Sequence, residues 1–352
     1  MSSGRRLSER LTGLAYRLGW KLICRVPSSW SRRAFTAVAD IAWRRQGPKV
    51  QVLEANLRRV LSYSYGRPDV DGKELRDLSR AALRSYARYW LEVFRLPVIP
   101  IERIVSGMHI DPEGEAELFA NLKAGRGVII SLPHTGNFEQ AGAWVVARGA
   151  GSFSTVVERL RPESVYEAFV RFRQGLGMEV LPLTGGQSPF GILAQRLRAG
   201  GLVCLVSDRD LTESGVEVDM FGEKARIAAG PAVLAVQTGA ALMPVATWFE
   251  GDDWGAHIYQ EIPVPASGTR VEKVAAMSQQ VARVFETAIA EHPQDWHMLQ
   301  RVFTADLDPA RLGIAPGGRP PGDPPPGGMP SPQTPLAPPF PPGVPPPRAG
   351  DP

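Results

Sequence analysis

The sequence predicts an α/β fold: a mostly parallel central sheet flanked by helices, preceded by amphipathic helices and followed by a disordered tail. Three observations predict it. The first 60 residues are basic with helical periodicity, short apolar runs alternate with helical segments over roughly residues 127–290, and proline dominates the last 40 residues. At 352 residues, the chain is long enough for one large domain or two small ones.

The first 60 residues form the most basic part of the chain. They hold 13 Lys and Arg against three acidic residues, a net charge of +10, so the remainder carries −6 of the total of +4. Leucines recur at three- and four-residue spacing from Leu7 to Leu22, and a second helix is expected from Ser29 or Ser31 to about Arg45. Such basic amphipathic helices suit an anionic membrane surface. The alternative is that the apolar stripe packs on the body and the basic face is exposed to solvent. The two interpretations are compatible if the helices pack edge-on and leave the basic face toward lipid.

The body begins with a helix from Ser79 to Phe94, closed by Pro97 and Pro100. Beyond it, each short apolar run ends at turn-forming residues, which is typical of buried strands. The expected strands are Gly127–Leu132, Phe153–Val157, Met178–Leu183, Leu202–Val206, Leu242–Phe249 and Ala256–Ile262. The expected helices are Phe138–Arg148, Val165–Leu176, Gly191–Arg198, Pro231–Gln237 and Val271–Ala290.

The tail has a different composition from the rest of the chain. Of the 33 prolines, 17 lie between Gly313 and Pro352, in a segment with scarcely any charge that we expect to be disordered or in polyproline II conformation. A proline-reading partner is the alternative to a non-catalytic tail. We therefore expect a basic helical arm packed on the core over residues 1–60, an α/β domain over 61–312 and a disordered tail over 313–352.

No segment predicts a membrane span or a secretory signal. The longest uncharged run outside the tail, Ile227 to Phe249, is interrupted by Gly230 and Pro231 and is more typical of a helix, a turn and a strand. Two cysteines are too few for a disulfide framework or a zinc site. We expect a peripheral protein on the cytoplasmic face of the plasma membrane.

The most informative segment runs from Ser131 to Glu139, where a buried strand ends, a turn follows and a helix begins. Ligands of α/β sheets bind at this edge, beyond the carboxyl ends of the strands. His134 lies in the turn, and Glu139, five residues on, can reach back toward its imidazole. A histidine held by a carboxylate is suited to take a proton from a hydroxyl. The alternative is a turn histidine that caps backbone groups.

Two further strands deliver ionisable residues to the same edge. Leu202–Val206 continues into Ser207–Leu211, which contains Asp208, and Phe153–Val157 continues into Glu158 and Arg159. Convergence of this kind predicts an active site. A metal site built from His134, Glu139 and Asp208 is not expected, because a second histidine at ligand spacing is missing. The other histidines, including His297, are assigned to packing.

Together these segments resemble the glycerolipid acyltransferase superfamily, whose motif is His-x4-Asp/Glu, and within it the bacterial lipid A biosynthesis lauroyl/myristoyl acyltransferase family. The resemblance is greatest to its actinobacterial members that acylate phosphatidylinositol mannosides, and it spans roughly residues 13–306. The matching segments are Leu132–Asn137, Glu158–Ser164, Leu181–Gly186, Asp208–Leu211, Phe221–Glu223, Gly230–Ala232, Thr238–Leu242 and Asp295–Gln300.

The resemblance implies transfer of a long fatty acyl group, typically palmitoyl, from acyl-CoA to a mannose hydroxyl of phosphatidylinositol mannosides, with no cofactor beyond the acyl-CoA co-substrate. His134 would be the general base, and Asp208, where the family usually has Glu, would support it. Glu139 stands where Asp is commoner in the family. The substrate-binding residues that the resemblance implies are Glu158, Arg159, Arg173, Ser214 and Gln237, the last at a position where the family has Glu.

Other functions stay open. A different glycolipid or a lysophospholipid would share this chemistry but differ as acceptor. A non-catalytic lipid-binding protein would bind lipid without releasing CoA. Nucleic-acid binding rests only on the basic arm, and the leucine and tryptophan stripe of that arm argues against it.

Overall fold

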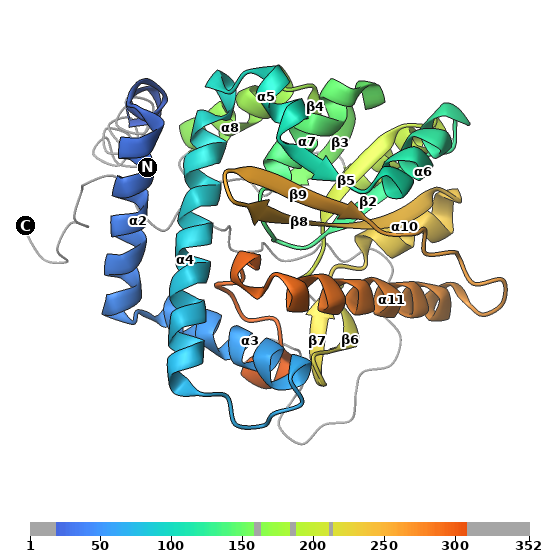
Figure 1. Cartoon of the computed structure of the whole chain (residues 1–352). Coiled ribbons are helices and arrows are strands. Elements are labelled where there is room, and N and C mark those ends of the chain that lie inside the picture. Colours follow the sequence, from blue (N-terminus) through green and yellow to red (C-terminus); the bar gives the residue numbers. More distant parts are fainter. Residues whose placement is uncertain (1–18, 158–162, 184–187, 211–213, 308–352) are drawn as a thin grey trace, which may run out of the picture.

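The structure, a computed structural model, describes residues 19–157, 163–183, 188–210 and 214–307 (Figure 1). A seven-stranded sheet with the order β1-β9-β8-β2-β5-β3-β4 forms its centre. Neighbouring strands are parallel except β8 and β9, which pair antiparallel. The strands are β1 (Met108–Ile110), β2 (Val128–Leu132), β3 (Phe153–Val157), β4 (Met178–Pro182), β5 (Leu202–Val206), β8 (Ala241–Glu250) and β9 (Asp253–Ile258).

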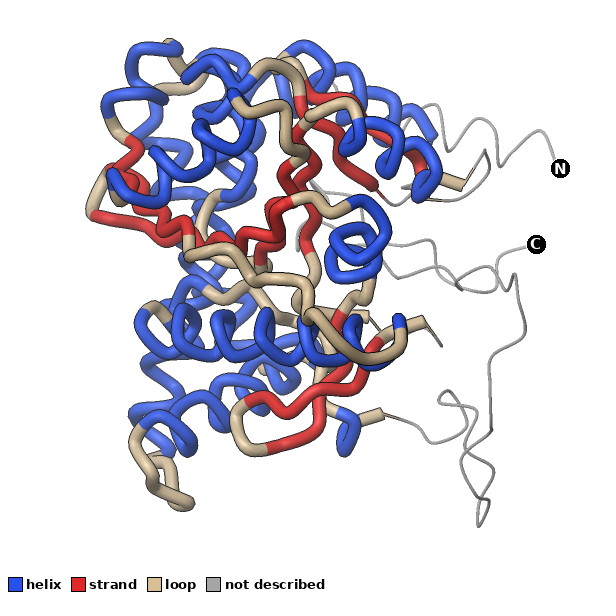
Figure 2. The backbone as a smooth tube through the Cα atoms, turned by 90° about the vertical axis from the view of Figure 1, so that its right-hand side faces the viewer, coloured by secondary structure: helices blue, strands red, loops and turns tan. Residues whose placement is uncertain are grey.

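Helices cover both faces of this sheet, as the side view in Figure 2 shows. One face is covered by α5 (Ile101–Ser106), α6 (Pro112–Lys123), α7 (Phe138–Val145) and α8 (Glu163–Gly175). The other is covered by α9 (Pro189–Arg198), α10 (Gly230–Thr238), α11 (Arg270–Glu291) and the hairpin of β6 (Val216–Met220) and β7 (Glu223–Ile227). Burial of both faces explains why the central strands are continuous apolar runs rather than alternating ones.

A third apolar cluster joins the N-terminal helices to this domain. These helices are α2 (Ser28–Arg45), α3 (Pro48–Ser64) and α4 (Gly72–Arg95), and α2 runs beside α4 in Figure 1. Trp20 packs against Phe94 with ring centroids 5.5 Å apart and donates its indole N–H to the Phe94 carbonyl at 2.7 Å. The described part of the arm is therefore packed on the body.

The predicted fold class is confirmed, and most predicted elements lie within a few residues of the observed ones. The predicted boundary at residue 60 falls inside α3, whose Val60 is part of the main core. The predicted helix Phe138–Arg148 ends as an α-helix at Val145 and continues as a π-helical turn to Ala150.

Among the described residues, three α-helices, one strand and one hairpin escaped the sequence analysis. They are α3, α5, α6, the short edge strand β1 and the β6–β7 hairpin. The helix α4 also starts earlier than predicted, because the Asp71 side chain accepts the Lys73 backbone N–H and caps it at Gly72. The predicted helix from Leu7 lies partly outside the described residues, and the tail lies wholly outside them. Within the described ranges, none of the helices combines the length and apolar character of a membrane span.

Candidate active site

The turn after β2 is held by close backbone contacts with β8. Gly136 has φ of +49°, and a Cβ atom there would lie 2.5 Å from the carbonyl carbon of Thr247. Only glycine fits both this conformation and this approach. Asn137 then caps α7 by accepting the backbone N–H of Gln140 at 3.0 Å. The turn is thus a defined platform that presents His134.

His134 and Asp208 meet across two neighbouring strands. β2 and β5 are parallel with Leu132 opposite Val206, so the residues two positions beyond these strand ends lie side by side. The His134 Nδ1 lies 2.6 Å from the Asp208 Oδ1, and the His134 backbone N–H donates to Oδ2 at 3.0 Å. The contact that the resemblance implied is therefore present and direct, despite the shorter aspartate.

Asp208 is fully buried and also accepts the indole N–H of Trp296 at 3.0 Å. Burial alone would raise the pKa of Asp208, but the imidazole and these three hydrogen bonds outweigh burial and hold that pKa below its usual value. The carboxylate thus stays ionised and fixes the ring with Nδ1 as donor. That leaves Nε2 as the basic nitrogen, on a side chain that is 21% exposed.

The segment Asp295–His297 crosses the same edge and contributes two more restraints. The His297 backbone N–H donates to the His134 carbonyl at 2.8 Å, and the Gly136 N–H donates to the Asp295 carbonyl at 3.0 Å. The His297 ring is buried, and burial together with the nearby His134 lowers the pKa of His297 to about 3. It therefore remains neutral, which agrees with the packing role predicted for it.

The expectation that Glu139 reaches back to His134 is wrong in this structure. Glu139 is 4% exposed, and its carboxylate forms an ion pair with the Arg173 guanidinium from α8, with Nε at 3.1 Å from Oε1. It lies in the first turn of α7, so its side chain projects from the helix toward α8 rather than back into the turn. The spacing of five residues identified a nearby acid but not the one that holds the imidazole.

An apolar cavity lies between the sheet and α7. It encloses ≈ 130 Å³ that water-sized molecules can enter, and Leu132, Phe138, Glu139, Ala141 and Arg173 belong to its lining. Phe138 also stands edge-on to the His134 ring, with centroids 6.1 Å apart. The rest of the lining is almost entirely aliphatic or aromatic. The cavity therefore comes close to the imidazole at Phe138, and its apolar lining suits part of a hydrocarbon chain.

The other predicted site residues have different outcomes. Ser214 follows β5, and its hydroxyl donates to Asp210 at 3.4 Å. Gln237 is exposed in the last turn of α10. Because β8, which follows that helix, begins opposite Val128 at the start of β2, Gln237 lies at the edge of the sheet opposite His134. The structure does not bring it to the site. Glu158 and Arg159 lie outside the described residues.

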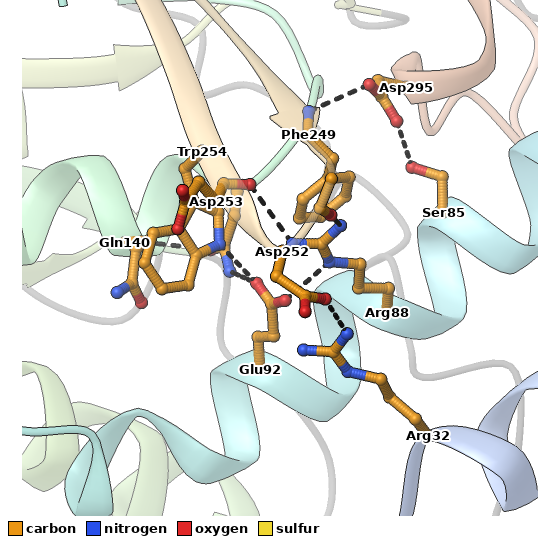
Figure 3. A network of polar contacts seen from close by, with 12 residues as sticks. Arg32, Ser85, Arg88, Glu92, Gln140, Phe249, Asp252, Asp253, Trp254 and Asp295 are labelled. Atoms are coloured by element: carbon orange, nitrogen blue, oxygen red, sulfur yellow. Dashed lines mark hydrogen bonds and ion pairs between the residues drawn. The ribbon is translucent and has the colours of Figure 1, made fainter. Parts of the chain in front are cut away.

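A buried carboxylate on α4, which the sequence analysis missed, anchors this platform. Glu92 accepts from Asn137 Nδ2 at 2.8 Å. It also accepts from Trp254 Nε1 at 2.6 Å and from Arg88 Nε at 2.6 Å (Figure 3). The signal for it was a charged residue on the apolar side of a predicted helix. Within the described ranges, no three His, Cys, Asp or Glu side chains gather closely enough to hold a metal ion.

The fold and the site define a class of protein: an enzyme on an open α/β sheet, with a histidine–carboxylate pair beside an apolar cavity. A sequence model of the family described as bacterial lipid A biosynthesis acyltransferase matches residues 3–305. The chain belongs to that family and is an acyltransferase.

Individual relatives are named more specifically. The chain is 47% identical over 311 residues to a Mycolicibacterium smegmatis protein named phosphatidylinositol mannoside acyltransferase, a match that covers 87% of this chain and 97% of the relative. It is 45% identical over 314 residues to a protein of the same name from Mycobacterium tuberculosis strain H37Rv, covering 87% and 92% of the two chains. The resemblance stated from the sequence is thereby confirmed.

Proposed function

We propose that this protein transfers a long-chain acyl group, palmitoyl by preference, from acyl-CoA to a mannose hydroxyl of phosphatidylinositol mannosides. The observation that carries the proposal is the His134–Asp208 contact beside an apolar cavity in a chain of this family. The acceptor is proposed from the names of the two mycobacterial relatives. Acyl-CoA acts as co-substrate, and the chemistry needs no bound cofactor.

His134 is the general base. Its Nε2 takes the proton of the acceptor hydroxyl as the hydroxyl oxygen attacks the thioester carbonyl carbon. The tetrahedral intermediate collapses with cleavage of the C–S bond, and the proton passes from the imidazolium to the departing CoA thiolate. Asp208 keeps Nδ1 protonated and stabilises the imidazolium while it exists.

The acyl chain occupies the cavity beside His134. An aliphatic lining stabilises a buried chain by about 0.8 kcal/mol per methylene. The Glu139–Arg173 pair is the charged part of the cavity lining. In this proposal it positions the thioester end of the acyl-CoA, where the reaction takes place. Glu158, Arg159 and Ser214 complete substrate binding in this proposal.

The protein acts at the cytoplasmic face of the plasma membrane, bound peripherally to anionic lipid. In support, α2 exposes 70% of Trp30 and 45% of Ile41, and the first 60 residues carry a net charge of +10. Binding to anionic vesicles should weaken with added salt and on substitution of both exposed residues by alanine. Equal vesicle binding by that double variant would contradict the assignment of this face.

The decisive experiment compares His134→Ala with wild type, using palmitoyl-CoA and purified phosphatidylinositol mannosides. CoA release and acylated product should fall about 10²–10⁴-fold, the usual contribution of a general base. His109→Ala is the matched control, because it removes an exposed imidazole from the edge strand β1. Undiminished product from His134→Ala would overturn the mechanism. Faster turnover of another glycolipid or a lysophospholipid would overturn the acceptor, and lipid binding without CoA release would overturn catalysis.

A further inference from the structure

A second cleft lies between α2, α4 and the segment that follows α11. It holds ≈ 300 Å³ and shares no lining residue with the cavity beside His134. Most of its lining residues are polar, and they include three arginines, Arg32, Arg84 and Arg88. Its volume is at the lower end of the roughly 300–1,000 Å³ that is usual for small-molecule sites.

Only one carboxylate, Asp295, belongs to this lining, and both of its oxygens are already hydrogen-bonded. Its Oδ1 accepts the Ser85 hydroxyl at 2.5 Å, and its Oδ2 accepts the Phe249 backbone N–H at 3.0 Å (Figure 3). Burial raises the pKa of Asp295. The cationic groups of the cleft are therefore its three arginines.

Two of these arginines have partners that an anion can replace. Arg32 pairs with Asp252, which is 76% exposed in the β8–β9 turn, and exposed pairs contribute little to stability. Arg84 contacts both oxygens of Asp40, but Arg80 contacts the same two oxygens and would keep that carboxylate paired.

Arg88 is the fixed member of the set. It donates to Glu92 and to the carbonyls of Gly251 and Asp253, and it lies 4.0 Å above the Phe249 ring. The Glu92 carboxylate balances the charge of Arg88, which is a fixed part of the cleft wall. The cleft thus combines one fixed and two exchangeable guanidinium groups, which match phosphate oxygens in geometry.

The remaining lining suits a polyol. Thr36 and Gln294 supply hydroxyl and amide groups, while Phe35, Leu91 and Phe249 supply apolar faces. The helix α2 carries both the cleft residue Arg32 and the exposed Trp30. At about 100° per residue, Arg32 lies roughly 160° around that helix from Trp30, so its lipid-facing side and its cleft side are opposite.

We propose that this cleft binds the phosphoinositol headgroup of an anionic membrane lipid at a site distinct from the reaction centre. Arg84 and Arg32 bind the phosphodiester, Arg88 forms the fixed wall of the cleft, and the polar lining residues bind the inositol hydroxyls. The inference goes beyond the proposed function and does not depend on it, because headgroup binding can be measured without any acyl donor.

The test is calorimetric titration of the full chain with glycerophosphoinositol, with inorganic phosphate and free myo-inositol as separate arms. Arg84→Gln should weaken glycerophosphoinositol binding about tenfold or more, as expected for a lost charge-assisted hydrogen bond. Arg33→Gln is the matched control, because it removes the same charge from an exposed position of α2 and should change the affinity less than twofold. Equal losses in the two variants would show general charge attraction and overturn the site.

Asp252→Asn tests the proposal in the opposite direction. Removing this exposed competitor frees Arg32, so affinity for glycerophosphoinositol should rise, by up to about fivefold. Because the residue lies in an exposed turn, loss of folding cannot mimic a gain. Unchanged or weaker binding would contradict the role of Arg32.

The other arms identify the ligand. Inorganic phosphate and myo-inositol should each bind at least tenfold more weakly than glycerophosphoinositol, and equal binding of phosphate would reduce the cleft to a simple anion site. Phosphatidylinositol vesicles should bind wild type better than phosphatidylglycerol vesicles of equal charge. Arg84→Gln should abolish this preference and Arg33→Gln should keep it, whereas a wild type without preference would overturn the membrane source.

Discussion

Replacing Asp208 by asparagine should abolish most turnover while leaving the protein folded. Asp208 accepts three hydrogen bonds, from His134 Nδ1, from the His134 backbone and from Trp296. An asparagine has one acceptor oxygen and one amino group for these three positions. Its orientation therefore decides the state of the imidazole.

If the amide oxygen takes the place of Oδ2, it still accepts the His134 backbone N–H and the Trp296 indole N–H. The amide amino group then donates to His134 Nδ1. The imidazole is then forced into the tautomer that carries its proton on Nε2. In that tautomer Nε2 cannot take the proton of the substrate hydroxyl. The opposite orientation points the amino group at two buried N–H donors, each of which costs about 1–3 kcal/mol when unsatisfied. The first orientation is favoured, so stability changes little and the wrong tautomer dominates.

We expect kcat to fall about 10²–10⁴-fold at saturating substrates, the upper value matching the same substitution in the Ser-His-Asp triad of serine proteases. The assay is CoA release from palmitoyl-CoA, with a thermal melt to check folding. Asp111→Asn is the matched control, because Asp111 also accepts two backbone N–H groups but at the opposite edge of the sheet. A folded Asp208→Asn protein with kcat within threefold of wild type would refute this reasoning.

Three further substitutions test the surroundings of the site. Arg173→Met should destabilise the protein by about 3–5 kcal/mol in urea unfolding, because it leaves the buried Glu139 unpaired. Adding Glu139→Gln should recover most of that loss, and no recovery would mean that the pair is not the cause. Ala141→Phe should narrow the cavity. The kcat/KM for palmitoyl-CoA relative to octanoyl-CoA should then fall about tenfold for every two methylenes excluded. Equal losses of kcat/KM for both substrates would mean that the acyl chain binds elsewhere. His297→Gln should reduce acid sensitivity: the pKa of His297 is about 3 when folded against about 6.5 unfolded, so wild-type stability falls by up to about 1.4 kcal/mol per pH unit as the pH drops through that window. Equal pH slopes for both proteins would contradict the buried neutral histidine.

Most of the fold could be predicted because its signals are local. Each central strand is an apolar run of five or so residues that ends in a turn, and burial on both faces makes that run continuous. Elements with weak local signals were missed. The hairpin strand Val216–Met220 alternates polar and apolar residues beside charged turns, and the three-residue Met108–Ile110 is too short for a pattern.

The candidate site was predicted in part. The turn His134–Asn137 and the acidic residues after Val206 were found because both follow buried strands at one edge of the sheet. Spacing alone assigned the sequence neighbour Glu139 to the imidazole, whereas the His134–Asp208 pair was implied only by the family resemblance. Trp296, Glu92 and the second cleft depend on contacts between residues far apart in the chain, for which no local pattern exists.

The sequence by itself determined the class of fold, the edge that carries the site and the family, because periodicity and motif order are properties of consecutive residues. Spacing offered Glu139 as the partner of His134 and the family resemblance offered Asp208, and the tertiary structure decided which carboxylate holds the imidazole. Asp208, 74 residues away, takes that place because β2 and β5 are parallel and in register at Leu132 and Val206. Glu139, although close in sequence, lies within a helix whose direction points its side chain to Arg173. Strand register and helix direction arise from packing of the whole chain, and spacing along the sequence does not contain them.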